Sequence, residues 1–458
     1  MKVLLLVCIL TVVSAGEADT EVNNIEAVIK QRDDEDNNYV VCTLADAAET
    51  SQISLEDISK SSIKRSPSSV IISLDNAIFF HRVRFIACQP GARYRTMDGR
   101  CNNARWQTWG STNQPFRRFL DPAYDDGKFV PRLRGVDGHP LPSPRAVSVA
   151  VHPGTDSPSD DSTVMVMQWG QFWTTTSPEL PSTQVGADTR EQLNLLTAFV
   201  DASNVYGLSE DQLSHLRNGR DDRVNVFPGL SVLHTVFVRE HNRLVKELAD
   251  VMPSTTPDDV LFEEARKIVS AIMQQITYRE WLPIIVGPLA MRKYRLTPGY
   301  SFRYNFTQNP TIYNVFASAA FRYGHSTIPH LLKSSEIWTP CSKALLKDRR
   351  QEVNRFINSG LTEHLFETSD NKGFDIVSLN IQRGRDHGLP SYNSFRKACR
   401  LPEVTSFDDS VFGKAGAALR SVYRSPDDID VFTGAVAEEH VSDGAVGPST
   451  GLSHWSTV

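Results

Sequence analysis

His325 is the histidine of this sequence whose surroundings best suit metal binding. It follows Arg322-Tyr323-Gly324 at the end of an apolar segment that predicts a helix over 313–323. An imidazole at such a place can point into the interior and bind iron through one ring nitrogen, provided that an acceptor orients the other nitrogen. Because isolated histidines of this kind are more often structural than ligating, the residue types alone leave both roles open.

Other familiar catalytic signatures do not occur in the chain. The sequence has no G-x-S-x-G elbow, no H-E-x-x-H zinc helix and no phosphate-binding glycine loop. His234 and His241 lie seven residues apart on one predicted helical face, and we expect core or capping roles for them. His139, His152 and His387 fall in predicted loops. The cysteines are too few for an iron–sulfur or zinc-thiolate site once one disulfide has formed, so any metal would need histidine or oxygen ligands.

The elements that must position His325 are predicted to be mostly α-helical. Helices are expected over 191–203, over 233–248, from residue 256 to 276 and over 313–323. The third begins with Thr256 as the expected N-cap and Pro257 at the first helical position. Its apolar stripe at helical spacing consists of Leu261, Ala265, Ile268, Ile272 and Ile276. Residues 76 to about 165 are rich in Pro, Gly and Asp and predict loops and short helices, and no alternating strand pattern of useful length occurs.

Length, charge and the N-terminal residues indicate an exported protein. The 458 residues suffice for a large core, and a net charge of -6 gives no indication of a nucleic-acid or anionic-membrane partner. Residues 1–15 combine Lys2 with a short apolar stretch, which is typical of a secretory signal peptide. The acidic and Ser-rich residues 16–75 predict an N-terminal extension or propeptide. No later segment is expected to span a membrane, and the single sequon, Asn305-Phe306-Thr307, is compatible with export.

The cysteines indicate one disulfide and leave an odd number. Cys8 would leave with the signal peptide, so five of the six cysteines remain. In an oxidising compartment an odd count means a free thiol, an intermolecular bridge or a missing partner. Cys88 and Cys101 bracket a polar loop and are expected to pair. The sequence leaves open the partners of Cys42, Cys341 and Cys399.

Seven sequence blocks resemble the animal haem peroxidase family. In chain order they are ARYRTMDGRCNN at 92–103, PFRRFLDPAYDDG at 115–127, LTAFVDASNVYG at 196–207, LHTVFVREHNRL at 233–244, FEEARKIVSAIMQQITYREWLPIIVG at 262–287, FRYGH at 321–325 and LNIQRGRDHGLPSYN at 379–393. Chance does not supply seven such blocks in one order. The resemblance implies a haem peroxidase domain over 76–447, mostly α with long loops and little β, followed by a divergent tail at 448–458.

The resemblance also implies a set of site residues. His325 would be the proximal ligand of a haem b iron, and Asn380 would accept a hydrogen bond from its other ring nitrogen, which makes the imidazole a stronger donor. Gln171 and Arg223 would lie on the distal side, where the charge of Arg223 would stabilise negative charge as the O–O bond of hydrogen peroxide breaks. The implied reaction is the oxidation of a small reducing donor by hydrogen peroxide.

A calcium loop is implied by the same resemblance. Its ligands would come from Thr197, Phe199, Asp201 and Ser203, and alternating side-chain and carbonyl oxygens suit a hard cation. The family supplies a further aspartate from the distal helix. Here that position is Thr176, so we expect an incomplete and weakened calcium site.

The sequence departs from the family pattern directly after Gln171. Thr174 replaces an aspartate that esterifies the haem, and Val226 replaces the glutamate of the second ester, so we expect haem to be held without covalent bonds. Thr175 replaces the distal histidine that moves the peroxide proton. A threonine hydroxyl cannot act as a base near neutral pH, so we expect impaired catalysis.

Two interpretations of these departures remain open. The stretches 176–197 and 206–223 are shorter than in typical members, cysteine-bearing segments are missing, and the chain stops soon after VGPSTG. One interpretation is a pseudoperoxidase that binds haem or a partner without turnover. The other is an incomplete or mis-spliced gene product whose ancestor was active, and the abrupt junctions favour this interpretation. In the extreme case such a chain would be unable to fold independently. The sequence does not determine the reducing donor or the oligomeric state.

Overall fold

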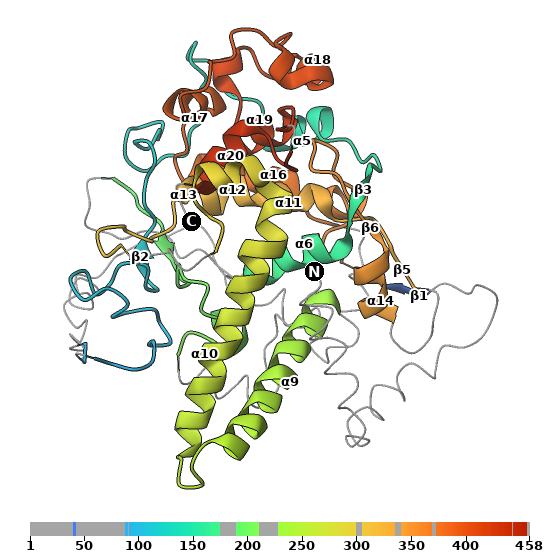
Figure 1. Ribbon diagram of the computed structural model, residues 1–458. Helices are drawn as coiled ribbons and strands as arrows, with labels where there is room; N and C mark the ends of the chain where they lie inside the picture. Colours follow the sequence, from blue (N-terminus) through green and yellow to red (C-terminus); the bar gives the residue numbers. More distant parts are fainter. Residues whose placement is uncertain are drawn as a thin grey trace.

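The computed structural model of the protein describes residues 40–42, 88–89, 91–174, 189–209, 228–298, 305–334, 340–368, 372–441 and 443–455 (Figure 1). The expected signal peptide, and all of the expected N-terminal extension except residues 40–42, lie outside these residues. None of the described helices is long and apolar enough to cross a bilayer.

Helices dominate the described residues, which confirms the mostly α expectation. The α-helices are α5 (Pro144–Val151), α6 (Val164–Thr174), α7 (Ser203–Tyr206), α9 (Pro228–Val251), α10 (Asp258–Ile276), α11 (Leu282–Val286), α12 (Pro288–Lys293), α13 (Asn314–Ser318), α14 (Pro340–Lys347), α15 (Ser359–Thr362), α16 (Ile376–Asp386), α17 (Tyr392–Ala398), α18 (Gly416–Arg420), α19 (Val431–Ala437) and α20 (Pro448–Trp455). A π-helix, η3 (Thr277–Trp281), and three 3₁₀ helices, η4 (Ala320–Thr327), η5 (Ser410–Ala415) and η6 (Pro426–Asp428), complete the helical set.

Strand structure is limited to three two-stranded antiparallel sheets in the described part of the chain. They pair β1 (Val40–Cys42) with β5 (Leu332–Ser334), β2 (Gln114–Pro115) with β4 (Leu193–Asn194), and β3 (Pro158–Thr163) with β6 (Arg349–Gln351). These short strand pairs link loops to one another and do not form a sheet layer. The helices therefore supply the core.

The two longest helices, α9 and α10, lie side by side and extend from the helical body (Figure 1). The predicted helix over 233–248 is confirmed by α9, which buries Leu233, Phe237 and Leu244. The predicted helix from residue 256 is confirmed by α10, but its N-cap position is Pro257 rather than Thr256. Asp258 and its neighbour Asp259 lie in the first turn, where their negative charges interact favourably with the positive end of the helix dipole.

The buried stripe of α10 differs in part from the predicted one. Leu261, Ala265 and Ile276 are buried as expected. The remaining buried apolar positions are Val269 and Met273, while the predicted Ile268 and Ile272 are only partly buried. The buried apolar positions therefore shift around the helix axis from one end of α10 to the other, because different segments pack against the helix along its length.

Helix α6 is fixed in the core by two tryptophans. Trp169, on α6, is fully buried and donates from its indole Nε1 to Oγ1 of Thr277, 3.3 Å away. Trp281 donates in return to the carbonyl oxygen of Val166, at 2.9 Å. Thr277 and Trp281 are the first and last residues of the π-helix η3, a rare type of helix.

The predicted helix over 191–203 is wrong. Its place is taken by strand β4, a loop and the single turn α7. Backbone groups here bond across to another segment: the carbonyl oxygens of Gln192 and Asn194 accept from residues 116 and 113, and the amide of Ala198 donates to residue 110. Side-chain hydrogen bonds around Asp201 add to this competition with helix formation.

The predicted helix over 313–323 is present but divided. Helix α13 ends at Ser318, and the 3₁₀ helix η4 begins at Ala320. Between them Ala319 has φ -139° and ψ -64°, outside the helical region. The break changes the direction of the chain between α13 and η4, the element that carries His325.

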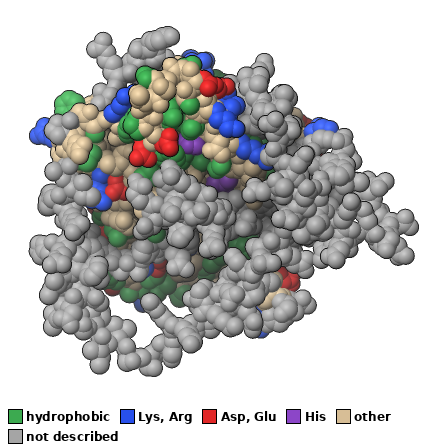
Figure 2. Space-filling view, turned by 90° about the horizontal axis from the view of Figure 1, so that it is seen from below, with side chains coloured by type: hydrophobic (Ala, Val, Ile, Leu, Met, Phe, Trp, Pro, Cys, Tyr) green, Lys and Arg blue, Asp and Glu red, His purple; other side chains and the backbone are tan. Residues whose placement is uncertain are grey.

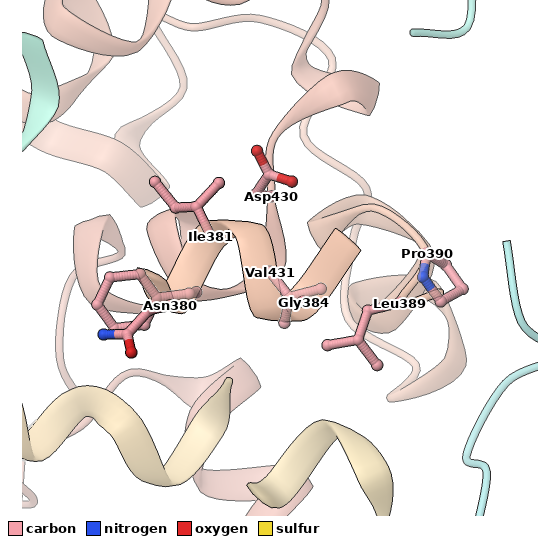
Figure 3. Close-up of a pocket in the computed structure, with 8 residues that line it drawn as sticks. Asn380, Ile381, Gly384, Leu389, Pro390, Asp430 and Val431 are labelled. Atoms are coloured by element: carbon pink, nitrogen blue, oxygen red, sulfur yellow. The ribbon is translucent and has the colours of Figure 1, made fainter. Parts of the chain in front are cut away.

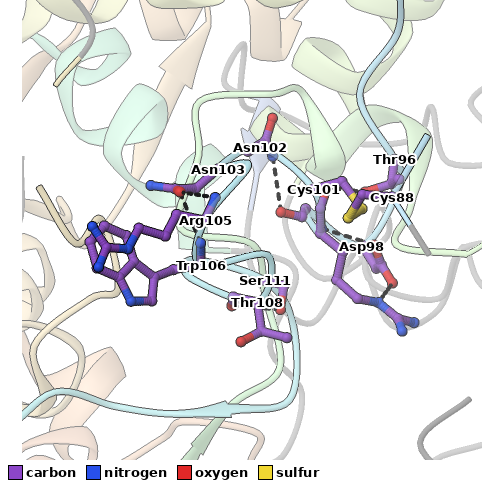
Figure 4. Close-up of a disulfide and its surroundings, with 12 residues drawn as sticks. Cys88, Thr96, Asp98, Cys101, Asn102, Asn103, Arg105, Trp106, Thr108 and Ser111 are labelled. Carbon is purple, nitrogen blue, oxygen red and sulfur yellow. Dashed lines mark hydrogen bonds and ion pairs between the residues drawn. A yellow bond between two sulfur atoms is a disulfide. The ribbon is translucent and has the colours of Figure 1, made fainter. Parts of the chain in front are cut away.

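The predicted disulfide between Cys88 and Cys101 is confirmed (Figure 4). Cys399 is a free, half-buried thiol, and burial raises its pKa to about 11. The side chains of Cys42 and Cys341 lie outside the described part of the chain. The arrangement of the remaining cysteines is therefore still open.

On the face seen from below, basic and acidic side chains lie interspersed with hydrophobic ones over the described surface (Figure 2). Much of this view is occupied by residues that are not described. A mixed charge distribution of this kind does not create a strong electrostatic potential of a single sign.

Candidate functional site

His325 and Asn380 lie in contact although they are 55 residues apart in the chain. His325 is in the last turn of η4, and Asn380 is fully buried in α16. Helix α16 begins at a defined place because Asp375 caps it, accepting from the backbone amides of Val377 and Ser378. Nδ2 of Asn380 lies 2.8 Å from Nδ1 of His325.

The hydrogen bond between these two residues runs in an unexpected direction. Oδ1 of Asn380 accepts from Nη1 of Arg322 at 3.2 Å, so the amide nitrogen of Asn380 faces the imidazole and donates to its Nδ1. The family resemblance implied the reverse, with Nδ1–H of His325 donating to Asn380. Turning the amide over would give the implied direction, and Arg322 would then need another acceptor.

Electrostatics around His325 favour a neutral imidazole and an anionic neighbour. Burial lowers the pKa of His325 to about 3, and the charge of Arg322 contributes. Burial also lowers the pKa of Arg322 to about 9, with a further contribution from Arg383. Arg322 forms no ion pair with any described carboxylate. Neutral imidazole is the form that binds metal, and the uncompensated positive charge suits a ligand that carries carboxylates.

Arg322 was not recognised as a site residue from the sequence. A signal was present, because it lies three residues before His325, and residues i and i+3 of a 3₁₀ helix lie above one another. Its contact with Asn380 depends on how η4 packs against α16, which sequence spacing does not specify.

The expected distal side is described only as far as the end of α6. Gln171 is half-buried, and its Oε1 accepts from Nε2 of Gln168 at 3.2 Å. Thr174 is the last residue of α6, and nothing is described of its side chain. The helix packs against η4, the element of His325. The four other positions expected on the distal side, namely Thr175, Thr176, Arg223 and Val226, lie outside the described residues.

The predicted calcium loop folds around Asp201. Thr197 donates from Oγ1 to Oδ2 of this aspartate at 2.8 Å, and the backbone amide of Ser203 donates to Oδ1 at 3.0 Å. Thr197 and Asp201 are buried, and burial raises the pKa of the carboxyl. Oγ1 of Thr197 also lies 3.4 Å from the hydroxyl of Ser203, so three side chains converge, of which only Asp201 is a carboxylate. No group of three His, Cys, Asp or Glu residues in the described part of the chain could hold a metal ion.

His234 and His241 are buried, in agreement with the core roles expected of them. Nδ1 of His241 lies 2.9 Å from the hydroxyl of Tyr206, which confirms a core role. His234 packs edge-on against Phe172, with ring centroids 4.9 Å apart. The ring nitrogens of His152 lie near the carbonyl oxygen of residue 355 and the hydroxyl of residue 433. None of these imidazoles has the buried amide and arginine that surround His325.

A small cavity of about 10 Å³ lies between α16 and the start of α19 (Figure 3). Asn380, Ile381 and Asp430 are among the residues that line it. The amide of Asn380 points away from the carboxylate of Asp430 in this view. The cavity has room for about one water molecule and none for a prosthetic group, so it is not the candidate site.

Comparison with known proteins agrees with the fold and with the family resemblance. The family model for animal haem peroxidase matches residues 94–187, 174–221, 219–343 and 329–452. Chorion peroxidase from Drosophila melanogaster is 32% identical over 480 residues, which cover 77% of this chain and 59% of that protein. Myeloperoxidase from Mus musculus is 31% identical over 521 residues, which cover 82% and 71%. The chain belongs to the animal haem peroxidase family.

The similarity to longer relatives is partial. The chain spans 59% of the length of the Drosophila chorion peroxidase and 32% of that of Drosophila peroxidasin. Among solved structures, peroxidase A from Dictyostelium discoideum superposes with a TM-score of 0.68 at 24% identity, covering 80% of this chain and 90% of that one. Fatty acid alpha-dioxygenase from Oryza sativa gives 0.65 at 18% identity, covering 80% and 78%. These structures share the fold.

Proposed function

We propose that this protein binds haem b through His325 and catalyses the peroxide-dependent oxidation of a small donor only weakly. The observation that carries the proposal is the neutral, half-buried imidazole of His325, which is held at 2.8 Å by a buried amide and lies beside an arginine that pairs with no described carboxylate. A haem carboxylate would supply the missing partner of Arg322. Family membership supports the same assignment.

Haem, when bound, supplies an iron that binds peroxide and exchanges electrons with it. Nε2 of His325 would hold that iron, and the amide of Asn380 would turn so that its oxygen accepts the Nδ1 proton. Arg322 would then leave the amide oxygen for a carboxylate of the haem. On the distal side Arg223 would contribute a fixed positive charge. Thr175 stands where a base is required, and its hydroxyl does not take up a proton near neutral pH.

Titration of the purified protein with haemin tests the binding site. We expect a Soret band and saturable binding for the wild type, and loss of both in His325→Ala. His139→Ala is the matched control, since His139 is exposed and its side chain pairs with Asp137 at the surface. Equal spectra for the wild type and His325→Ala would disprove the assignment of the ligand.

A non-catalytic role is the second candidate function, and the replaced distal positions Thr174, Thr175, Thr176 and Val226 favour it. Such a protein would bind haem, or a partner, without turnover. The two candidates are distinguished by the rate of donor oxidation in the haem-loaded protein. A rate equal to that of free haemin supports the non-catalytic role, and a higher rate that falls in His325→Ala supports weak catalysis.

We expect the haem to be bound without covalent links, because the ester-forming carboxylates are replaced by Thr174 and Val226. Acid-acetone extraction should therefore release all haem from the loaded wild-type protein, even after exposure to peroxide. The variant Thr174→Asp/Val226→Glu provides the comparison, since it restores both carboxylates. Haem that stays on the wild-type polypeptide would contradict this prediction.

Calcium is expected to bind weakly, because Asp201 is the one carboxylate of the loop and Thr176 replaces the remote aspartate. By calorimetry the dissociation constant should be far above the value of about 10⁻⁸ M found in cytosolic buffer proteins. Thr176→Asp should tighten binding, and Asp201→Asn should abolish it. Tight binding in the wild type, unaffected by Asp201→Asn, would place the ion elsewhere.

Export from the cell is a further part of the proposal. The pattern of residues 1–15 and the disulfide between Cys88 and Cys101 support it, since disulfides persist in oxidising compartments. Analysis of the medium of expressing eukaryotic cells tests it directly. An N-terminus that begins after residue 15 is the expected result.

A further inference from the structure

We propose that the surface at the C-terminal end of α12 binds a sulfated polysaccharide. This α12 basic surface consists of Arg292, Lys293 and Arg295, and all three residues are exposed. Its biological use rests on the proposed export of the protein, because sulfated polysaccharides are extracellular polymers. Binding by the purified protein depends neither on export nor on haem.

The α12 basic surface lies in a part of the sequence that contains no acidic residue. Between Glu280 and Glu336 there is no Asp or Glu, although the whole chain has 54 of them. The basic residues of this stretch are Arg292, Lys293, Arg295, Arg303, Arg322 and Lys333. The charge of the stretch is therefore positive in a protein whose net charge is -6.

The three cations of the α12 basic surface pair with no described carboxylate. Nζ of Lys293 lies 5.3 Å from the centroid of the Tyr294 ring, a contact that leaves its charge uncompensated. Asp443 lies at the opposite end of α12, where its Oδ2 accepts from the backbone amide of Leu289 at 2.8 Å. Three neighbouring cations repel one another, and an anionic ligand would remove this repulsion.

The third cation occupies a backbone position at which glycine is the usual residue. Arg295 follows the helix with φ 57°, in the left-handed region. Its amide donates to the carbonyl oxygen of Arg292 at 3.1 Å, and the amide of Leu296 donates to that of Met291 at 2.9 Å. This pattern ends many helices and favours Gly at the position of Arg295. Met291 and Leu296 are buried, so the packing of both residues fixes the reversal of the chain.

An arginine is strained in this conformation, because its Cβ is crowded where a glycine would not be. Arg295 makes no hydrogen bond or ion pair to the described residues that would offset the strain. A strained residue without such a compensating contact indicates a role outside the packing of the fold. An anionic ligand that binds the guanidinium group would account for an arginine at this place.

The chemistry of the three side chains favours a linear sulfated polymer. Guanidinium groups bind sulfate oxygens through two parallel hydrogen bonds, and a lysine adds a compact charge. Neighbouring cations on an exposed turn can each contact a different sulfate of one chain, and runs of basic residues are typical of such surfaces. A membrane surface fits less well. Helix α12 has six residues, of which Leu289 is the one large apolar side chain that is exposed, whereas interfacial helices bury a whole apolar face.

Calorimetric titration of the purified full-length chain with a heparin oligosaccharide tests the proposal. We expect saturable binding at physiological ionic strength that weakens as salt is added, because salt screens exposed charges. The triple variant Arg292→Gln/Lys293→Gln/Arg295→Gln should raise the dissociation constant about tenfold or more, which is the effect of losing three exposed ion pairs.

A matched control removes the same charge elsewhere. Arg239 and Lys246 on α9 and Lys414 in η5 are exposed and form no ion pair with the described residues. The variant Arg239→Gln/Lys246→Gln/Lys414→Gln should therefore leave the dissociation constant within about twofold of the wild-type value.

Arg295→Gly separates binding from folding. Glycine removes the strain at φ 57°, so the denaturant midpoint of this variant should equal or exceed that of the wild type. Heparin binding should nevertheless weaken about threefold, since one exposed ion pair is lost. Damage to the fold would lower both quantities together, so this variant tests the binding role of Arg295 directly.

The remaining outcomes are equally decisive. Absence of binding at physiological salt overturns the proposal, as does an unchanged dissociation constant in the triple variant or an equal loss in the matched control. Tighter binding to phosphatidylserine vesicles or to double-stranded DNA than to heparin would also overturn it, by assigning the surface to another polyanion. Haemin titration of the triple variant should give the wild-type Soret band. Failure of the haem site and failure of the α12 basic surface are thus distinguishable.

Discussion

Replacement of Thr175 by histidine is expected to raise the peroxidase rate of the haem-loaded protein by about 100- to 10,000-fold, the usual contribution of general acid–base catalysis. Cleavage of the peroxide bond needs a group that takes the proton from the near oxygen and a positive charge that helps the far oxygen leave. In the proposed site Arg223 would supply the charge. Gln171 can donate or accept a hydrogen bond, but an amide does not take up a proton at physiological pH.

Stopped-flow measurement of peroxide consumption, with a phenolic donor, checks this prediction. Thr175→Val is the matched control, because it introduces a side chain of similar size without a base and should leave the rate unchanged. The gain in Thr175→His should disappear when His325→Ala is added. A wild-type rate as high as that of intact peroxidases would reveal another base, and the explanation based on Thr175 would fail.

Replacement of Asp430 by alanine is expected to destabilise the fold by about 3–5 kcal/mol, the typical cost of removing one partner of a buried ion pair. Asp430 is buried and accepts from Arg132 at 2.8 Å and from Arg385 at 2.9 and 2.7 Å. The hydroxyl of Tyr423 donates to it as well, at 2.8 Å. Without the carboxylate, two guanidinium groups would remain buried near one another.

The same group predicts a dependence of stability on pH. Burial by itself would raise the pKa of Asp430, but the charges of Arg385 and Arg132 lower it below the usual value. A lowered folded-state pKa contributes stability that is present above the unfolded pKa of about 4 and is lost as the pH falls through the folded value. The free energy of unfolding of the wild type should therefore fall more steeply below pH 4 than that of Asp430→Asn.

Denaturant unfolding at several pH values provides the measurement. Asp408→Asn is the control, because Asp408 pairs with Arg420 at the surface, where both side chains are exposed. Exposed pairs of this kind contribute about 0–1 kcal/mol. Similar losses in the Asp430 and Asp408 variants would show that the buried cluster adds no particular stability.

Local patterns predicted those parts of the fold in which side-chain spacing alone decides the outcome. Leu233 and Phe237 recur at helical spacing, and α9 buries both. Cys88 and Cys101 bracket a short polar loop and form the expected disulfide. Each of these features depends on residues that are close together in the chain.

Tertiary structure decided the features that depend on distant partners. Residues 191–203 read as a helix, but their backbone groups bond to the segment at 110–116, so strand β4 and a loop form instead. Helix α13 likewise ends at Ser318, and Nε of Arg322 donates to the carbonyl oxygen of Ala317 at 3.1 Å. Neither outcome can be inferred from helical spacing, because competing backbone partners leave no local pattern.

The sequence by itself determined the family, and it predicted His325 as the haem ligand and Thr175 at the position of the distal base. Only the tertiary structure showed that Arg322 shares the amide of Asn380 with His325, and that this amide turns its nitrogen toward the ring. The physical reason is that the direction of a hydrogen bond depends on which donors and acceptors surround the amide in space. Residues 55 positions apart in the chain acquire that relation only when η4 and α16 pack together.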